Sequence, residues 1–176
     1  MTGQGTAATS LGELIIRRAL PEDHNALLAL SNDVDAWLHS RGISQGVPPR
    51  PMSDIFAERT ARGAQYVGTI DGEVAGTIVL EWADDGVWAN APDDACYVHG
   101  FAVRRAYAGI GLVLLGWAER MAAAAGKPVL RLDCTAENLA LRAYYERASY
   151  THRSDVRLPH RGAARYEKAV SEPRAL

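Results

Sequence analysis

The spacing of apolar residues along the chain predicts that strands and helices alternate. Apolar positions recur every three or four residues in four segments, which predicts helices over residues 22–40, 54–62, 111–125 and 137–148. Runs rich in apolar and β-branched residues predict strands over residues 13–20, 64–70, 73–82, 95–103 and 129–134. A final hairpin is predicted over residues 149–170, around Pro159 and Gly162.

Turn residues separate these elements. Asp71-Gly72 lies between two strand-like runs, and this dipeptide favours the tight turn of a hairpin. Gly126, with Pro128 beyond it, ends the helix before it. The resulting order predicts an α/β (α+β) fold with a mixed sheet and helices on both faces. We expect one domain over residues 13–176, preceded by a flexible tail over residues 1–12.

The composition narrows the classes of function. Basic and acidic residues nearly balance, at 19 and 21, for a net charge of −2. This balance argues against non-specific binding to nucleic acid or to an anionic membrane. No apolar stretch reaches the length of a membrane span, and the first residues do not read as a signal peptide. Cys96 and Cys134 have neither a disulfide framework nor metal-ligand spacing, so we expect a cytoplasmic protein without a metal.

The segment from Val103 to Lys127, VRRAYAGIGLVLLGWAERMAAAAGK, joins two arginines and two glycines to the start of an apolar helix. Backbone N–H groups at a helix N-terminus point at one spot, and the helix dipole favours negative charge there. Glycine lets a phosphate approach the backbone closely. The segment lacks the GK[ST] of a P-loop and the three glycines of the dinucleotide fingerprint. It therefore indicates an anion site of another kind.

Two motifs and the order of elements carry a resemblance to a known family. The strand ending FAVRR, the loop to Gly109-Ile110-Gly111 and the following helix resemble the Q/R-x-x-G-x-G/A pyrophosphate loop of the GNAT superfamily of acyl-CoA-dependent N-acetyltransferases. The segment LRLDCTAENLALRAYYERASY resembles the second GNAT signature, in which Asn138 precedes Tyr145 by seven residues. The resemblance extends from about Leu14 to Val170. It implies a GNAT-like mixed, mostly antiparallel sheet of six to seven strands, flanked by helices.

The resemblance also implies that acetyl-CoA is the cosubstrate. Its pantetheine arm is expected to lie along the edge of the strand at residues 101–103, where a backbone N–H near Phe101 would polarise the thioester carbonyl. Backbone amides of residues 105–112 are expected to hold the pyrophosphate. The residues that the resemblance assigns to cofactor binding are Phe101, Ala102, Val103, Arg104, Arg105, Gly109, Ile110, Gly111, Leu112, Asn138 and Tyr145.

For the chemistry, the resemblance implies direct attack of an amine on the thioester. It makes Tyr145 the general acid that protonates the leaving thiolate. The sequence leaves the general base open between Glu81 at a strand end, His99 in the strand before the loop, and an ordered water. Tyr144 is expected to pack its helix against the sheet.

Signals for the acceptor are weaker. Asp93 and Asp94 are candidates for attracting a cationic substrate. Trp82 and Trp88 flank a loop that we expect to overhang the acceptor, whereas Trp37 and Trp117 are expected in the core. A solvated face is expected for the arginines of the final hairpin, Arg153, Arg157 and Arg161.

Departures from the family pattern leave alternatives open. Ala106 occupies the usual Gln/Arg position of a loop about two residues shorter than the common form, and Ser149 replaces the usual glycine. The main function is expected to be acetyl transfer to a primary amine of a small molecule or peptide. The alternative is a non-catalytic acyl-CoA-binding regulatory module of the same fold. A homodimer is an open expectation, because exposed strands of the final hairpin can pair between chains.

Overall fold

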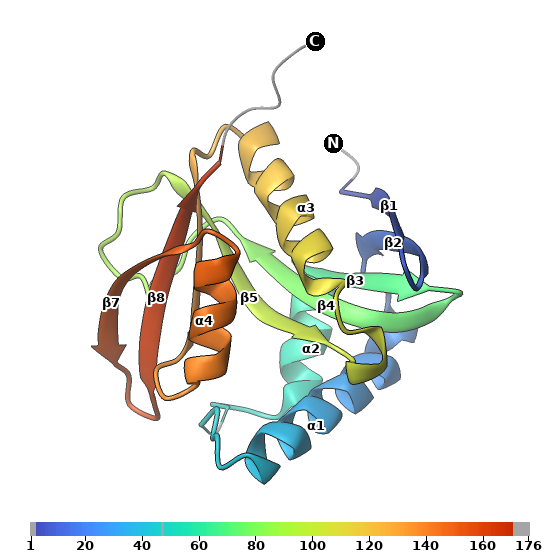
Figure 1. Cartoon of the computed structure of the whole chain (residues 1–176), viewed down its shortest axis with the longest axis horizontal. Coiled ribbons are helices and arrows are strands. Elements are labelled where there is room, and N and C mark those ends of the chain that lie inside the picture. The colour runs from blue at the N-terminus through green and yellow to red at the C-terminus, as the bar shows by residue number, and fades with distance from the viewer. Residues whose placement is uncertain (1–2, 47, 171–176) are drawn as a thin grey trace.

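A twisted β-sheet crosses the computed structural model, which describes residues 3–46 and 48–170 (Figure 1). Within these residues the sheet has eight strands in the order β1-β2-β3-β4-β5-β6-β8-β7. The strands are β1 (Gly5–Thr9), β2 (Gly12–Arg18), β3 (Gln65–Ile70), β4 (Glu73–Glu81), β5 (Ala95–Val103), β6 (Val129–Thr135), β7 (Thr151–Arg157) and β8 (Gly162–Ala169). Only β5 and β6 run parallel among these neighbours. The predicted mixed, mostly antiparallel sheet is confirmed.

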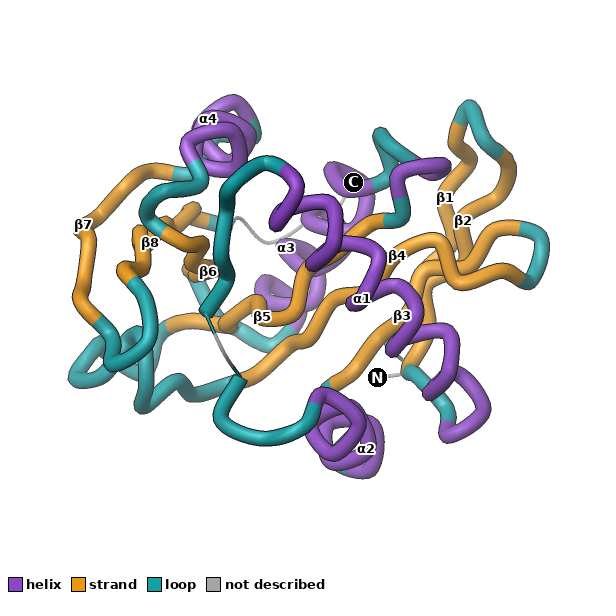
Figure 2. The backbone as a smooth tube through the Cα atoms, turned by 90° about the horizontal axis from the view of Figure 1, so that it is seen from below, coloured by secondary structure: helices purple, strands orange, loops and turns teal. Residues whose placement is uncertain are grey.

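Helices cover both faces of the sheet. They are α1 (His24–Ser40), α2 (Met52–Ala61), α3 (Gly111–Ala124) and α4 (Leu139–Arg147), with short 3₁₀ turns at Pro21–Asp23 and Arg105–Tyr107. Figure 2 shows α4 on one side of the sheet and α2 on the other. No helix in the described part of the chain is both long and apolar enough to cross a bilayer.

Two apolar clusters fix these layers. The larger one joins α3 and α4 to the sheet through buried residues such as Leu114, Leu132 and Tyr166. The smaller one holds α1 and α2 against the opposite face through Leu27, Phe56 and other residues. Burial of such side chains supplies most of the stabilisation, at about 25 cal/mol per Å² of apolar surface. The two helical layers are therefore fixed independently on either side of one sheet.

The turn signals act as predicted. Asp71 and Gly72 both have positive φ, at 51° and 82°, as a two-residue hairpin turn between β3 and β4 requires. Gly126 has φ 73° and follows the last turn of α3. The side chain of Asn138 accepts a hydrogen bond from the Leu141 N–H and caps α4.

The N-terminal prediction was wrong for part of its range. Residues 5–9, expected within a flexible tail, form β1, which pairs with β2 from Gly5↔Ile16 to Thr9↔Gly12. With this strand the sheet has eight strands, where six to seven were predicted. The small residues of GTAAT give no apolar alternation to detect. Gly5 also lies so close to the Trp117 ring that a Cβ would come within 2.7 Å of Cδ1. Residues 1–2 lie outside the described range.

Candidate active site

The parallel pair β5 and β6 opens into a fork. The two strands pair from Ala95↔Val129 to Val98↔Leu132 and no further in the described structure. Beyond that point β5 continues along β4 to Val103, and β6 continues along β8 to Thr135. We call the gap between residues 99–103 and 133–135 the fork. Backbone groups of β5 that face the fork lose their partner on β6, so this edge can accept an extended ligand.

A β-bulge lies in β5 beside the fork. One residue lies between Thr77 and Val79 on β4, whereas two lie between their respective partners Ala102 and His99 on β5. Gly100 has φ 51°, a left-handed conformation that suits glycine. Gly100 and Phe101 therefore have no partner residue on either neighbouring strand. A backbone N–H of the bulge that faces the fork can polarise a carbonyl placed there.

The start of α3 carries free backbone donors. Leu114 N–H makes the first intrahelical bond, to the Ile110 carbonyl. In the described part of the chain, the N–H groups of Gly109, Gly111 and Leu112 have no hydrogen-bond acceptor, and no side chain caps the helix. Ile110 differs from the prediction, because its N–H already donates to the Tyr107 carbonyl at 3.3 Å. The other free amides and the helix dipole form a site for an anion.

Gly111 keeps this helix start close to the fork and to α4. A Cβ at residue 111 would lie 2.6 Å from the Tyr144 hydroxyl and 3.2 Å from the Phe101 ring. Any larger residue would have to displace one of these rings. Tyr144 is half-buried and packs against the large cluster, as predicted, yet its hydroxyl also borders the anion site.

The two arginines before the loop, which the resemblance assigns to cofactor binding, contact α1 and β4. Arg104 donates to the Val74 carbonyl at 2.8 Å and to Ala26 and Asp33 at 3.2 Å, and its N–H donates to Ala75. Arg105 stacks over Trp37, 4.7 Å from the ring centre. The end of β5 runs beside α1, so its arginines reach that helix first. Trp37, expected in the core, is a half-buried partner of this arginine.

Tyr145 projects from α4 into an aromatic cluster beside the fork. Its side chain is 3% exposed, and its ring centre lies 5.8–6.5 Å from those of Tyr144, Phe101, Tyr150 and Tyr166. Burial raises its pKa well above the ordinary value, and nearby Cys134 and Asp133 act in the same direction. Its hydroxyl forms no hydrogen bond with the described residues. Tyr145 therefore stays protonated at neutral pH and has a donor to offer.

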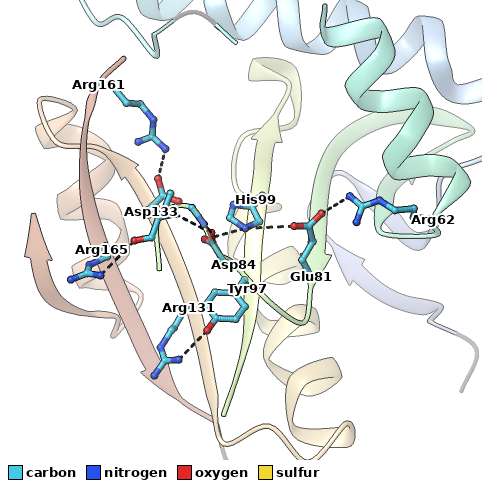
Figure 3. Close-up of polar contacts among 11 residues, drawn as sticks. Arg62, Glu81, Asp84, Tyr97, His99, Arg131, Asp133, Arg161 and Arg165 are labelled. Atoms are coloured by element: carbon cyan, nitrogen blue, oxygen red, sulfur yellow. Dashed lines mark hydrogen bonds and ion pairs between the residues drawn. The ribbon is translucent and has the colours of Figure 1, made fainter. Parts of the chain in front are cut away.

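The opposite face of the sheet, towards α1 and α2, carries an acid–histidine group. His99 Nε2 lies 3.5 Å from Asp84 Oδ2 and 4.0 Å from Glu81 Oε2, so the two proposed alternatives for the base are neighbours (Figure 3). Arg62 at the end of α2 binds Glu81 Oε1 at 2.8 Å. Two carboxylates beside one imidazole give this group the means to accept a proton.

Asp84 is a residue that sequence reasoning missed. Its side chain is 7% exposed, and Oδ1 accepts hydrogen bonds from the N–H groups of Gly86 and Val87. Oδ2 is buried without a hydrogen-bond partner in the described structure and faces His99. The DDG sequence after β4 favours such a turn, but it does not show that the turn directs a carboxylate at a histidine one strand away.

Further along this face, polar side chains of β6, β7 and β8 pair with one another beside the fork (Figure 3). Asp133 at the end of β6 binds Arg161 of the β7–β8 turn, so Arg161 is ion-paired instead of part of a solvated face. Arg165 on β8 bonds the Ser154 hydroxyl and stacks on Trp88. These contacts hold the hairpin next to the acid–histidine group.

The aspartates predicted to attract a cation are already paired. Asp93 binds Lys127 at 2.6 Å, and Asp94 binds Arg131 at 2.9 Å. Trp88 is buried between the guanidinium groups of Arg131 and Arg165 and anchors its loop. Each of these three side chains therefore already has a partner within the protein.

Trp82 is exposed and lines a cavity of about 590 Å³. The cavity reaches from Glu81 and Arg62 to Met121 and Ala125 near the C-terminal end of α3. It lies at the far end of that helix from the anion site, so it is separate from the fork. Trp117 is buried, as predicted.

Comparison with known proteins identifies the arrangement. The model of the acetyltransferase (GNAT) family matches residues 33–150, which contain the fork, the loop before α3, α4 and the acid–histidine group. The chain belongs to the GNAT acetyltransferase family. The predicted resemblance is thereby confirmed, and the protein is an acetyltransferase.

Relatives of this GNAT acetyltransferase agree. YesJ of Bacillus subtilis (strain 168), an uncharacterized N-acetyltransferase, is 32% identical over 142 residues, which are 75% of this chain and 78% of YesJ. A GNAT acetyltransferase from Listeria monocytogenes 4b F2365 has a TM-score of 0.73 at 24% identity, over 94% of this chain and all of the other. RimL, an alpha-N-protein acetyltransferase of ribosomal L7/L12 solved with coenzyme A, has a TM-score of 0.67 at 17% identity, over 96% of this chain and 100% of RimL. The solved structures show that the fold is shared.

Both cysteines of the GNAT acetyltransferase are buried thiols. Burial raises the pKa of Cys96 and of Cys134 to about 12. Neither is a nucleophile at neutral pH. Among residues 3–46 and 48–170, no group of three or more His, Cys, Asp and Glu side chains is arranged to hold a metal ion.

Proposed function

We propose that the protein transfers an acetyl group from acetyl-CoA to a primary amine by direct attack at the fork. Acetyl-CoA supplies the activated thioester. The single observation that carries the proposal is the fork itself, with free amides of α3 at its outer end, the bulge of β5 in its wall and Tyr145 beside it. RimL, which shares the fold, was solved with coenzyme A.

The cofactor site is formed mainly by backbone. The N–H groups of Gly109, Gly111 and Leu112 bind the pyrophosphate, since they have no competing acceptor in the described structure. The β5 edge at residues 101–103 binds the pantetheine amides as an added strand would. Asn138 holds the start of α4, so it acts by positioning Tyr145. Arg104 and Arg105 remain with α1.

The chemical step uses groups on both sides of β5. The N–H at the bulge, near Phe101, stabilises the oxyanion that forms as the amine attacks, and such donors contribute about 2.7–4 kcal/mol each. Tyr145 donates a hydrogen bond to the departing sulfur and completes its protonation. Its raised pKa means that it acts as a donor throughout the neutral range.

Proton removal from the amine is assigned to the acid–histidine group on the other face. His99 and Glu81 remain alternatives, with Asp84 positioning His99. The variants Glu81→Gln and His99→Gln distinguish them, because loss of the general base lowers kcat by roughly 10²–10⁴-fold. A drop of that size in neither variant would point to an ordered water.

A thermal-shift screen with acetyl-CoA, CoA, ATP and NAD tests cofactor binding. We expect the melting temperature to rise with the two CoA compounds alone, because a ligand that binds only the folded state stabilises it. Release of CoA thiol in the presence of amines then tests turnover. Binding without turnover over a broad amine panel would favour the non-catalytic module instead. Stabilisation by ATP or NAD alone would contradict the proposal.

A further inference from the structure

Arg59, on the inner side of α2, has no ion-pair partner among the residues that the structure describes. It forms no ion pair and no side-chain hydrogen bond within residues 3–46 and 48–170, although it is only partly exposed. Burying a guanidinium without a partner costs folding free energy. Burial lowers the pKa of Arg59, and Arg62 and Arg50 act in the same direction, whereas Glu81 and Glu58 raise it.

The carboxylates near Arg59 are committed elsewhere. Glu58 pairs with Arg50 and with Arg62, at 3.4 Å for the second pair. Glu81 binds Arg62 at 2.8 Å. Arg50 and Arg62 are therefore ion-paired on this side of the site. Arg59 alone of the three arginines has no carboxylate within ion-pair distance in the described structure.

Arg59 lies directly over the bulge of β5. Its Nη1 is 3.3 Å from the position that a Cβ at Gly100 would take. Gly100 is exposed even though it lies within a central strand, so this point is open. Across the opening, the segment between α1 and α2 meets the β7–β8 turn, where a Cβ at Gly46 would lie 3.2 Å from the His160 carbonyl oxygen. An acceptor at the bulge would thus have Arg59 as its nearest unpaired charge.

We propose that the acceptor is a primary amine with a carboxylate a few atoms away, as in an amino acid, and that Arg59 binds this carboxylate. This inference rests on the proposed function. A guanidinium binds a carboxylate through two parallel N–H donors, which fixes position as well as charge. With the carboxylate on Arg59, the amine of such an acceptor lies beside Gly100 and Phe101, where the thioester is to be attacked. Arg59 is therefore a specificity-determining residue.

A single arginine favours a carboxylate over a phosphate ester. A phosphate monoester carries nearly two charges at neutral pH. Its second charge would require Arg62, which Glu81 and Glu58 already bind. An amine bearing a phosphate is therefore a useful competing probe.

The first test compares matched acceptors in the CoA-release assay. The panel holds α-amino acids, their carboxamides, the corresponding decarboxylated amines and O-phosphoethanolamine. We expect kcat/KM for the preferred amino acid to exceed that for its carboxamide by about tenfold or more, the effect of a charged hydrogen-bonded pair. Equal rates with the carboxamides, or preference for the phosphate ester, would overturn the assignment.

The second test uses Arg59→Met, which keeps the length of the side chain and removes the charge. We expect KM for the amino acid to rise about tenfold or more, with kcat and the KM for acetyl-CoA little changed. The KM of Arg59→Lys for the amino acid should lie between those of wild type and Arg59→Met, because lysine retains the charge without the two parallel donors. The matched control is Arg120→Met on the exposed side of α3, which should change neither constant. Unchanged discrimination in Arg59→Met would refute the inference.

Calorimetry without turnover separates this inference from the proposed function. N-acetyl amino acids, the expected products, should bind the wild-type protein and bind Arg59→Met at least about tenfold more weakly. If no amine is acetylated but this difference is found, the catalytic proposal fails and the carboxylate site stands. If amines without a carboxylate are acetylated and Arg59→Met acts like wild type, the catalytic proposal stands and the carboxylate site is refuted.

Discussion

The two sides of the fork are built from different kinds of groups. On the side of α3 and α4, the free donors are backbone amides, and the neighbouring arginines are turned towards α1. On the side of α1 and α2, the site consists of charged side chains in pairs, with Arg59 left over. Amides carry no net charge and cannot change rotamer, so they suit a cofactor that is the same in every cycle. Side chains can be exchanged one at a time, so they suit the choice of an acceptor.

The strongest challenge to this comparison is Gly111→Val. Its Cβ would meet the Tyr144 hydroxyl and the Phe101 ring, so either these rings or the start of α3 must be displaced. We expect the Kd for acetyl-CoA, measured by calorimetry, to rise about 100-fold, in line with the cost of a displacement near 1 Å. Gly116→Ala, where the nearest atom would be 3.7 Å from the added Cβ, is the control and should bind normally. Normal binding by Gly111→Val would show that the amides are not the site.

Tyr145→Phe tests whether the fork also contains the acid. Loss of the hydroxyl should lower kcat by roughly 10²-fold while leaving the Kd for acetyl-CoA unchanged, because only the leaving group loses its donor. Tyr144→Phe, one residue earlier on the same helix, is expected to keep most of its kcat. A rate for Tyr145→Phe equal to that of wild type would remove Tyr145 from the mechanism.

Asp84→Asn tests the acid–histidine group on the α1–α2 side of the fork, and it leaves the cofactor side unchanged. The amide oxygen can still accept from Gly86 and Val87, but His99 loses a neighbouring negative charge. We expect kcat to fall about tenfold, a smaller loss than removal of a general base would cause. The KM for acetyl-CoA should not change. Asp93→Asn, whose residue binds Lys127 at the surface, is the control. An unchanged kcat would mean that Asp84 serves only the loop.

Asp23→Asn should affect stability and neither side of the fork. Asp23 binds Arg17 at 2.6 Å and accepts from the Leu20 N–H before α1. The hydrogen bond from Arg17 lowers the pKa of Asp23. Its stabilisation is therefore present above the unfolded carboxyl pKa, near about 3.9, and is lost as pH falls through the lower folded value.

Urea unfolding at neutral pH should show a loss of up to about 2 kcal/mol for Asp23→Asn, since the pair is partly exposed. The gap between variant and wild type should close in acid. A gap that widens in acid would contradict the sign of this argument. The kcat of Asp23→Asn should remain that of wild type.

The sequence predicts the backbone-built side of the fork better than the side built from charged side chains. The bounds of β5 and the glycines of the loop were readable, because strand pattern and glycine requirement are local properties. Arg59 and Asp84 were missed, since one looks like an exposed helix arginine and the other like a loop aspartate. The contacts of Arg104 with Ala26 and Asp33 were not readable either, because the sequence does not show that α1 passes beside the end of β5. Long-range neighbours decide the role of a charge, and a single sequence does not reveal them.

The bulge at Gly100 has one further consequence. Along β5, the side chains that join the α3–α4 cluster are Cys96, Val98, Phe101 and Val103, so their interval is two, then three, then two. The extra step shifts the phase of the strand. If the strand kept Gly100 but had no bulge, regular alternation would turn the phenyl ring of Phe101 towards the acceptor and send Ala102 in the opposite direction. An apolar alternation that is interrupted by one extra residue, just before a loop with two glycines, is a pattern that can be searched for in other sequences.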